Sequence, residues 1–265
     1  MEFMSRPIAI CYHSVGNSNM SGLSIDKEIF EQQILLLKSK GLRFERVIDQ
    51  DNDDKKTVSI SFDDGYLDNY DVVLPILKKH KVLATFFITV GALEKNDKVM
   101  ERLARYSGQL EFMKADHVKK LHDLGHEIGN HTFSHPCLKS LSSDQITAEI
   151  KYSQMALKQI TNCTPRSVAI PFGRFGNHYT FEIFNLLKGL GFSKIASLNK
   201  IEQINNFLTP RFPITQNTSF KELEGFIDNK WNTRELIKKY LPRYIFNQLN
   251  GFEKKICDRN SDSLL

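Results

Sequence analysis

Residues 58–65 read VSISFDDG, an apolar run followed by two adjacent acids and a glycine. Serines alternate with β-branched and aromatic residues, which predicts a buried β-strand that ends at Phe62. Asp63 and Asp64 follow at once, and Gly65 allows the backbone to turn sharply. Two carboxylates this close disfavour joint ionisation unless a cation is nearby. The stretch therefore predicts either a surface turn or the acidic half of a metal site.

Two histidines further along the chain offer the other half of such a site. Residues 131–136 read HTFSHP, and Pro136 disfavours a helix at His135. The pair therefore differs from the helical H-E-x-x-H zinc arrangement. With one carboxylate and two imidazoles as ligands, a second carboxylate is left to deprotonate water. Three protein ligands leave one coordination position open, as in catalytic zinc sites.

Strand-like and helix-like segments alternate along most of the chain. Strands are expected at 7–12, 57–62, 82–90, 127–130, 167–170 and 192–196, and helices at 26–40, 71–80, 116–124, 143–160 and 179–190. This alternation predicts an α/β fold with parallel strands and helical crossovers in one sheet or barrel. Active residues gather at the carboxyl ends of such strands. His13, the acidic pair and His131 all follow expected strands.

Composition narrows the classes of function. The chain has 265 residues and a net charge of +5, and its basic residues are dispersed, so no nucleic-acid partner is expected. No apolar run reaches the roughly 20 residues of a membrane span. The first residues lack the features of a secretory signal, which favours a cytoplasmic location, peripheral to the membrane if the tail binds there.

The C-terminal residues differ in pattern from the rest of the chain. From residue 226 the alternation stops, and basic and aromatic residues dominate a predicted helical tail, 226–265. The tail is expected to pack on the barrel or extend from it. A weak contact with a membrane surface is the alternative interpretation.

Three motifs resemble those of the polysaccharide deacetylases, the NodB-homology enzymes of carbohydrate esterase family four. They are SFDDG at 61–65, HTFSHP at 131–136 and AIPFG at 169–173, with a matching lead-in, GHEIGN, at 125–130. The resemblance covers about residues 7–215. It implies a distorted (β/α) barrel as a single catalytic domain, residues 1–225. It also implies hydrolysis of acyl groups, usually the acetyl of N-acetyl sugars, with a divalent metal: Zn²⁺ first, with Co²⁺ or Ni²⁺ as alternatives.

The resemblance also implies roles for individual residues. Asp63 would be the general base, and Asp64, His131 and His135 the metal ligands. The backbone N–H of Phe172 would join the metal in stabilising the oxyanion, a role that needs no particular side chain.

Two departures from the family pattern call for substitutes. Ala169 stands where many members have an arginine that orients the base, and Arg211 is the candidate replacement, with Arg166 and Arg174 as rivals. The usual late histidine, source of the general acid, is missing. His13, in CYHSV at 11–15, resembles the Y-H-x-V opening of a subgroup in which this histidine takes its place. A packed histidine at a strand end is the alternative.

The expected function is therefore removal of an N-acetyl group from a sugar in surface glycan biosynthesis. The partner would be an N-acetylated sugar, a nucleotide-linked or lipid-linked sugar, or a glycan. Two other classes stay open. One is a related hydrolase of another C–N bond, in a cyclic amide, a ureide or a formamide. The other is a non-catalytic glycan-binding relative.

Overall fold

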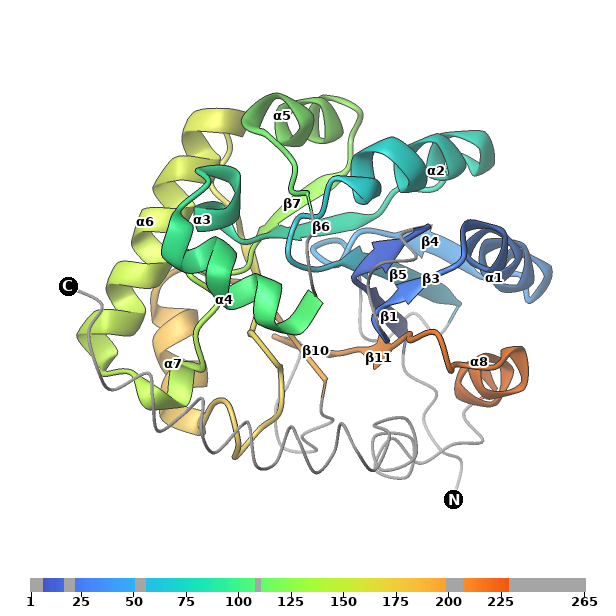
Figure 1. Cartoon of the computed structure of the whole chain (residues 1–265). Helices are drawn as coiled ribbons and strands as arrows, with labels where there is room; N and C mark the ends of the chain where they lie inside the picture. Colours follow the sequence, from blue (N-terminus) through green and yellow to red (C-terminus); the bar gives the residue numbers. More distant parts are fainter. Residues whose placement is uncertain (1–6, 17–21, 51–55, 108–110, 199–206, 229–265) are drawn as a thin grey trace, which may run out of the picture.

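Parallel strands form a nearly closed barrel with helices around its outside (Figure 1). The structure is a computed structural model and describes residues 7–16, 22–50, 56–107, 111–198 and 207–228. Within these ranges, no helix is both long enough and apolar enough to pass through a lipid bilayer.

The barrel strands pair in the order β10-β9-β8-β7-β6-β5-β1-β11, and β4 pairs with β5 outside this path. Their bounds are β1 Ile8–Tyr12, β4 Arg43–Glu45, β5 Thr57–Phe62, β6 Thr85–Ile88, β7 Glu127–Asn130, β8 Ser167–Ala169, β9 Lys194–Ser197, β10 Leu208–Pro210 and β11 Phe212–Pro213. A separate small pair consists of β2 Ser14–Val15 and β3 Ser24–Ile25.

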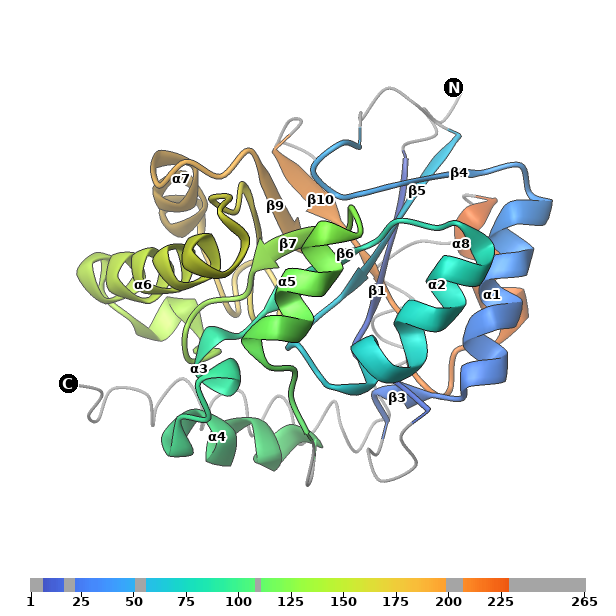
Figure 2. The ribbon, with the colours of Figure 1, turned by 90° about the horizontal axis from the view of Figure 1, so that it is seen from above.

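Helices connect most of these strands. Their bounds are α1 Lys27–Ser39, α2 Leu74–His80, α3 Val90–Leu93, α4 Asp97–Ser107, α5 Ala115–Asp123, α6 Ser143–Thr161, α7 Phe181–Gly189 and α8 Phe220–Ile227. A π-helical segment, Asn69–Val73, leads into α2, and a 3₁₀ turn, Leu138–Ser140, precedes α6. Figure 2 shows α3 and α4 together at the end of the barrel toward which β1 runs.

The predicted alternation and barrel are confirmed, with corrections in detail. The strand expected at 82–90 is shorter in the structure: it is β6, Thr85–Ile88, and a short helix begins at Val90. The helix expected from residue 71 starts as the π-helical segment. β10, β11, α4 and α8 were not predicted. The two strands are too short to show a period, since Pro210 and Pro213 interrupt the run.

Local signals explain where the longest helices begin and end. The Asp26 carboxylate accepts hydrogen bonds from the backbone N–H groups of Glu28 and Ile29, at 2.8 and 3.3 Å, and so caps α1. Ser142 and Gln145 form a capping box at the start of α6. Asn162, in the left-handed conformation, ends that helix.

The barrel strands present apolar side chains to the helices and small or polar ones to the interior. Along β5, Val58, Ile60 and Phe62 belong to the core shared with the helices. Ser59 and Ser61 alternate with them, and the Ser59 hydroxyl bonds to the Gln50 side chain inside the barrel. The interior beside β5 therefore contains hydrogen-bonded polar side chains.

Interior side chains form layers along the barrel axis. At the amino end, buried Glu127 accepts hydrogen bonds from Thr85 Oγ1 at 2.7 Å, from the N–H of Ile48 at 3.0 Å and from Ser167. Burial raises the pKa of this carboxyl group. The next layer is apolar and consists of Val47, Phe87, Ala169 and Ala196. These layers close one end and support the site at the other.

The barrel closes through a segment that changes strand partners at Arg211. On one side of it, β10 pairs with β9, and on the other side β11 pairs with β1. The N–H of Arg211 donates to the carbonyl of Ser197 at 2.8 Å. The first strand, β1, and the last strand, β11, thus lie side by side.

The predicted tail lies almost entirely outside the described residues. Helix α8 runs across the expected boundary between residues 225 and 226. The division into residues 1–225 and 226–265 therefore stays a prediction.

We expect Gly129→Ala to destabilise the protein. A Cβ atom at Gly129 would lie 2.4 Å from Phe87 Cδ1, so the ring beneath the site must shift. Such overpacking typically costs about 1–3 kcal/mol. The free energy of unfolding from urea titration measures it.

Gly189→Ala is the matched control for this substitution. Gly189 lies at the end of α7, and a Cβ atom there would meet no atom of the described residues within 4 Å. Alanine there should leave stability unchanged or raise it by up to about 1 kcal/mol. Equal effects of the two substitutions would contradict the packing argument.

Candidate active site

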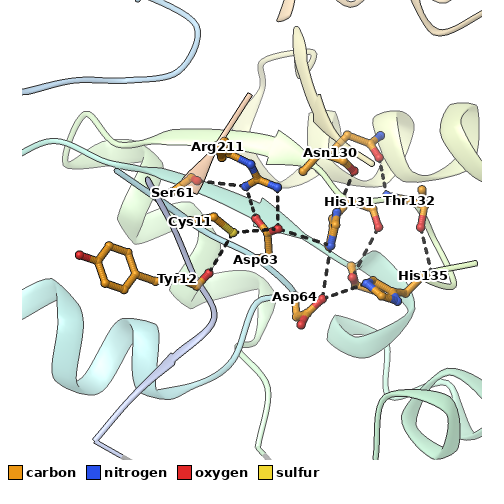
Figure 3. Close-up of polar contacts among 12 residues, drawn as sticks. Cys11, Tyr12, Ser61, Asp63, Asp64, Asn130, His131, Thr132, His135 and Arg211 are labelled. Atoms are coloured by element: carbon orange, nitrogen blue, oxygen red, sulfur yellow. Dashed lines mark hydrogen bonds and ion pairs between the residues drawn. The ribbon is translucent and has the colours of Figure 1, made fainter. Parts of the chain in front are cut away.

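Asp64, His131 and His135 converge in a buried cluster at the carboxyl ends of β5 and β7 (Figure 3). Asp64 Oδ1 lies 3.4 Å from His131 Nε2 and 3.3 Å from His135 Nε2. Atoms that bind a tetrahedral zinc ion at about 2.0–2.2 Å lie roughly 3.3–3.6 Å from one another. The three residues thus fit a divalent metal in chemistry and in spacing.

The ring nitrogens of the first histidine have separate roles. His131 Nδ1 lies 2.8 Å from the carbonyl oxygen of Ala169, which can only accept a hydrogen bond. The proton therefore sits on Nδ1, and Nε2 is left to face Asp64. Burial lowers the pKa of His135 to about 3, so its ring is neutral, the form that binds metal.

The backbone around this cluster is strained. Asp64, Thr132, His135 and Phe172 have φ values of 75°, 66°, 53° and 61°, in the left-handed region that favours glycine. Such residues cost of order 1–3 kcal/mol each and persist only where surrounding contacts impose them. Their concentration at one end of the barrel indicates a functional site.

Helix α6 supplies the contacts that impose this conformation on the histidine loop. The Glu149 carboxylate accepts from the N–H groups of Phe133 and Ser134, at 3.0 and 2.8 Å, and from the Ser134 hydroxyl at 2.7 Å. Asn130 adds a bond from its Oδ1 to the N–H of Thr132 at 2.7 Å. The half-buried Glu149 side chain thus faces the loop rather than solvent.

Asp63 forms a buried, two-pronged ion pair with Arg211. Arg211 Nη1 and Nη2 donate to the two carboxylate oxygens at 2.6 and 2.8 Å, and Nη1 also donates to Ser61 Oγ at 3.0 Å. The guanidinium rests over the Phe87 ring, 5.1 Å from its centroid. The alternatives differ: Arg166 is exposed, and Arg174 is half-buried in the loop after β8.

The ion pair sets the charge of Asp63. Burial alone would raise the pKa of this carboxyl group, but Arg211 and His131 outweigh burial and lower it below its ordinary value. Burial also raises the pKa of Cys11 well above normal, so its thiol stays protonated. The Cys11 thiol donates a hydrogen bond to Asp63 Oδ2, 3.4 Å from Sγ. The sequence analysis did not predict this contact.

Arg211 and Ala169 both adjoin the Phe87 ring. Ala169, where an arginine was expected from the family pattern, lies in the apolar interior layer with Ala196 and Phe87. Arg211 enters just above Phe87 from the seam between β10 and β11. An arginine at 169 would compete for the same volume.

His13 and Phe172 lie beside this cluster. Donor atoms of His13, Cys11 and Asp63 lie within 4.8 Å of one another. Arg211 already supplies a positive charge beside Asp63, which disfavours the binding of a metal ion by His13, Cys11 and Asp63. The Phe172 ring packs edge-on against His135, with centroids 4.8 Å apart.

Two further buried histidines accept hydrogen bonds from backbone N–H groups. His126 is buried, and its Nδ1 accepts from the N–H of Ala84 at 3.2 Å. His178 is also buried, and its Nδ1 accepts from the N–H of Arg174 at 3.1 Å. Neither belongs to the metal cluster.

The family model for polysaccharide deacetylases matches residues 50–194, more than half of the chain. The chain belongs to the polysaccharide deacetylase family. Among curated relatives, the peptidoglycan-N-acetylmuramic acid deacetylase PdaA of Bacillus subtilis is 35% identical over 111 residues, 42% of this chain and 35% of that protein. A peptidoglycan-N-acetylglucosamine deacetylase of Bacillus cereus is 31% identical over 120 residues, 45% of this chain and 37% of that protein. The matched segments thus span little more than a third of these relatives.

Solved structures share the fold over nearly their whole length. Streptococcus pyogenes PplD, in complex with acetate, superposes with a TM-score of 0.68 at 23% identity, over 85% of this chain and 99% of that one. IcaB from Ammonifex degensii gives a TM-score of 0.70 at 22% identity, over 84% and 97%. The barrel is thus that of known polysaccharide deacetylases.

We expect Glu149→Gln to weaken metal binding. The glutamine amide carries no charge, and its NH₂ group cannot accept from the N–H groups of Phe133 and Ser134. The loop that positions His131 and His135 is therefore held less tightly. Loss of such outer contacts typically costs about 10–100-fold in metal affinity. Titration calorimetry of the metal-free protein with Zn²⁺ measures it.

Asp144→Asn is the matched control, an identical change of charge on the exposed first turn of α6. It should leave zinc affinity unchanged. If Glu149→Gln binds zinc as tightly as the control, the loop does not depend on Glu149.

Proposed function

We propose that this protein is a metal-dependent N-deacetylase that hydrolyses the acetamide of an N-acetylated sugar to a free amine and acetate. The observation that carries the proposal is the pairing of two neighbouring carboxylates with different partners. Asp64 faces the two imidazoles, and Asp63 faces Arg211. Membership of the polysaccharide deacetylase family supports the sugar substrate.

Asp64, His131 and His135 would hold the metal, for which Zn²⁺ is the first candidate. A bound divalent ion supplies Lewis acidity, which polarises the acetyl carbonyl and acidifies water. Asp63 is the proposed base: it is ionised and lies 4.0 Å from His131 Nε2, next to the ligands. It takes the proton of the attacking water.

Two further groups complete the proposed reaction. The Phe172 N–H donates to the oxyanion as the carbonyl becomes tetrahedral, a contribution of about 10²–10³-fold for such a donor. His13 donates a proton to the departing nitrogen, because an amine leaves poorly as an anion. Asp63 then releases its proton to solvent, His13 takes a proton up from solvent, and acetate departs.

The buried base argues against a binding-only relative. A carboxylate taken out of water is costly even when paired, and glycan binding has no use for it. No observation favours a cyclic amide, ureide or formamide over a sugar. The substrate panel below separates these alternatives.

The proposal predicts acetate release that depends on metal. Zinc-, cobalt- or nickel-loaded protein should release acetate from N-acetyl sugars, nucleotide sugars or glycan oligomers, and metal-free protein should not. Activity restricted to small non-sugar amides would reject the sugar substrate. Inactivity of all metal-loaded forms on the whole panel would reject the enzyme.

Asp63→Asn and Asp64→Ala should separate base from ligand. Asp63→Asn should bind zinc normally but lose about 10²–10⁴-fold in kcat, the range for assisted proton transfer. Asp64→Ala should lose zinc and activity together. Zinc content and acetate release are measured on the same samples. Near-normal turnover by Asp63→Asn would refute its role as the base.

Arg211→Gln should move the acidic limb of the kcat/KM profile to higher pH. The arginine lowers the pKa of Asp63 against burial, so without it burial dominates and the base is protonated at higher pH. Activity that needs ionised Asp63 is then lost earlier as pH falls. Arg166→Gln, at an exposed arginine, is the control and should leave the profile unchanged. Coincident profiles would show that Arg211 does not set the charge of the base.

A further inference from the structure

The ring of His13 must be oriented by something other than a bond at Nδ1. This nitrogen is buried and has no hydrogen-bond partner among the residues that the structure describes. The contrast is His131, whose Nδ1 bonds to the Ala169 carbonyl. The direction of the His13 ring therefore depends on how the backbone of residues 13–15 is held.

Asn69 contacts that backbone directly. Its Nδ2 donates to the carbonyl oxygen of His13 at 2.8 Å and to Asp68 Oδ1 at 2.8 Å. Both partners only accept, so the amide nitrogen must face them and the orientation of Asn69 is set. The side chain is fully buried. Asn69 therefore fixes the carbonyl of the residue that is the proposed acid.

Asp68 holds the two residues that follow. Its carboxylate accepts from the hydroxyl of Ser14, at 2.5 Å through Oδ2, and from the N–H of Val15. Burial raises the pKa of Asp68 to about 6, which leaves it ionised and a strong acceptor at neutral pH. Three consecutive residues, 13–15, are thus bonded to one neighbouring pair.

The local backbone brings this pair into place. Asn69 begins the π-helical segment that leads into α2, and β2 packs against that segment. π-Helical turns are rare and concentrate at functional sites. Gly16 continues the contact: a Cβ there would lie 3.4 Å from Val72 of the same segment.

We propose that Asp68 and Asn69 are positioning residues that aim the ring of His13 at the nitrogen of the departing amine. The inference rests on the proposed function. It means that the stretch Asp63–Asn69 carries the base and a metal ligand at its start and the support of the acid at its end.

A pair of substrates tests this role. An N-acetylglucosamine oligomer needs a proton on its leaving amine, whereas 4-nitrophenyl acetate has a leaving group that needs none. With zinc-loaded protein, Asn69→Ala should lose about 10–100-fold in kcat on the oligomer, part of the ~10²–10⁴-fold that proton transfer contributes. Ester hydrolysis and zinc affinity should stay at wild-type values.

A double-mutant comparison makes the test specific. His13→Ala should show the same split between substrates, and His13→Ala/Asn69→Ala should be no slower than His13→Ala alone. Ser14→Ala removes a different bond of the same support and should give a smaller loss of the same kind. It replaces Asn69→Ala if that variant does not fold. Asp71→Asn, exposed on the same π-helical segment, should behave as wild type.

The outcomes separate this inference from the proposed function. Three results would overturn the positioning role alone. Asn69→Ala could lose equally on both substrates, or its effect could add fully to that of His13→Ala. It could also lose nothing on the oligomer although His13→Ala is slower than wild type. A wild-type protein that hydrolyses the ester but no N-acetyl sugar would instead overturn the proposed function.

Discussion

Two carboxylates that are neighbours in the chain are both buried at the carboxyl end of β5, and each needs a partner that compensates for its removal from water. Asp63 has the guanidinium of Arg211 on both of its oxygens. Asp64 has two imidazoles at 3.3–3.4 Å, the spacing of a shared metal ion. Unpaired, either carboxylate would cost several kcal/mol and would take up a proton instead. Two chemically identical side chains therefore have different surroundings.

The rest of the barrel serves to keep those partners in place. Phe87 fills the interior below Arg211, and Gly129 leaves room for its ring. Glu149 holds the histidine loop from outside the barrel, in a conformation that the loop residues would not adopt alone. Rigid elements thus surround the strained positions on both sides, which is how a site keeps a geometry that local preferences oppose.

Short-range patterns were enough to predict β1, β5–β9, most helices and the convergence of the two motifs. The acidic pair and the histidines end strands whose periodicity is clear, and parallel strands place their carboxyl ends together. The contact of Glu149 with the histidine loop could not be predicted, because its position in the helical pattern is that of an ordinary solvent-exposed acidic residue. Arg211 was a candidate only because Ala169 left a gap. Its ion pair depends on the pairing of two strands of three and two residues, which carry no periodic signal. The tail lies outside the described residues, so its interpretation stays a prediction.

The seam at Arg211 also has a consequence for how the molecule matures. Asp63 and its cationic partner are separated by 148 positions in the chain. A nascent chain exposes the carboxylate long before the arginine emerges, and the barrel cannot close until residues 208–213 have paired on both sides. A ribosome-bound or truncated fragment that ends short of these strands therefore lacks the cation that compensates Asp63.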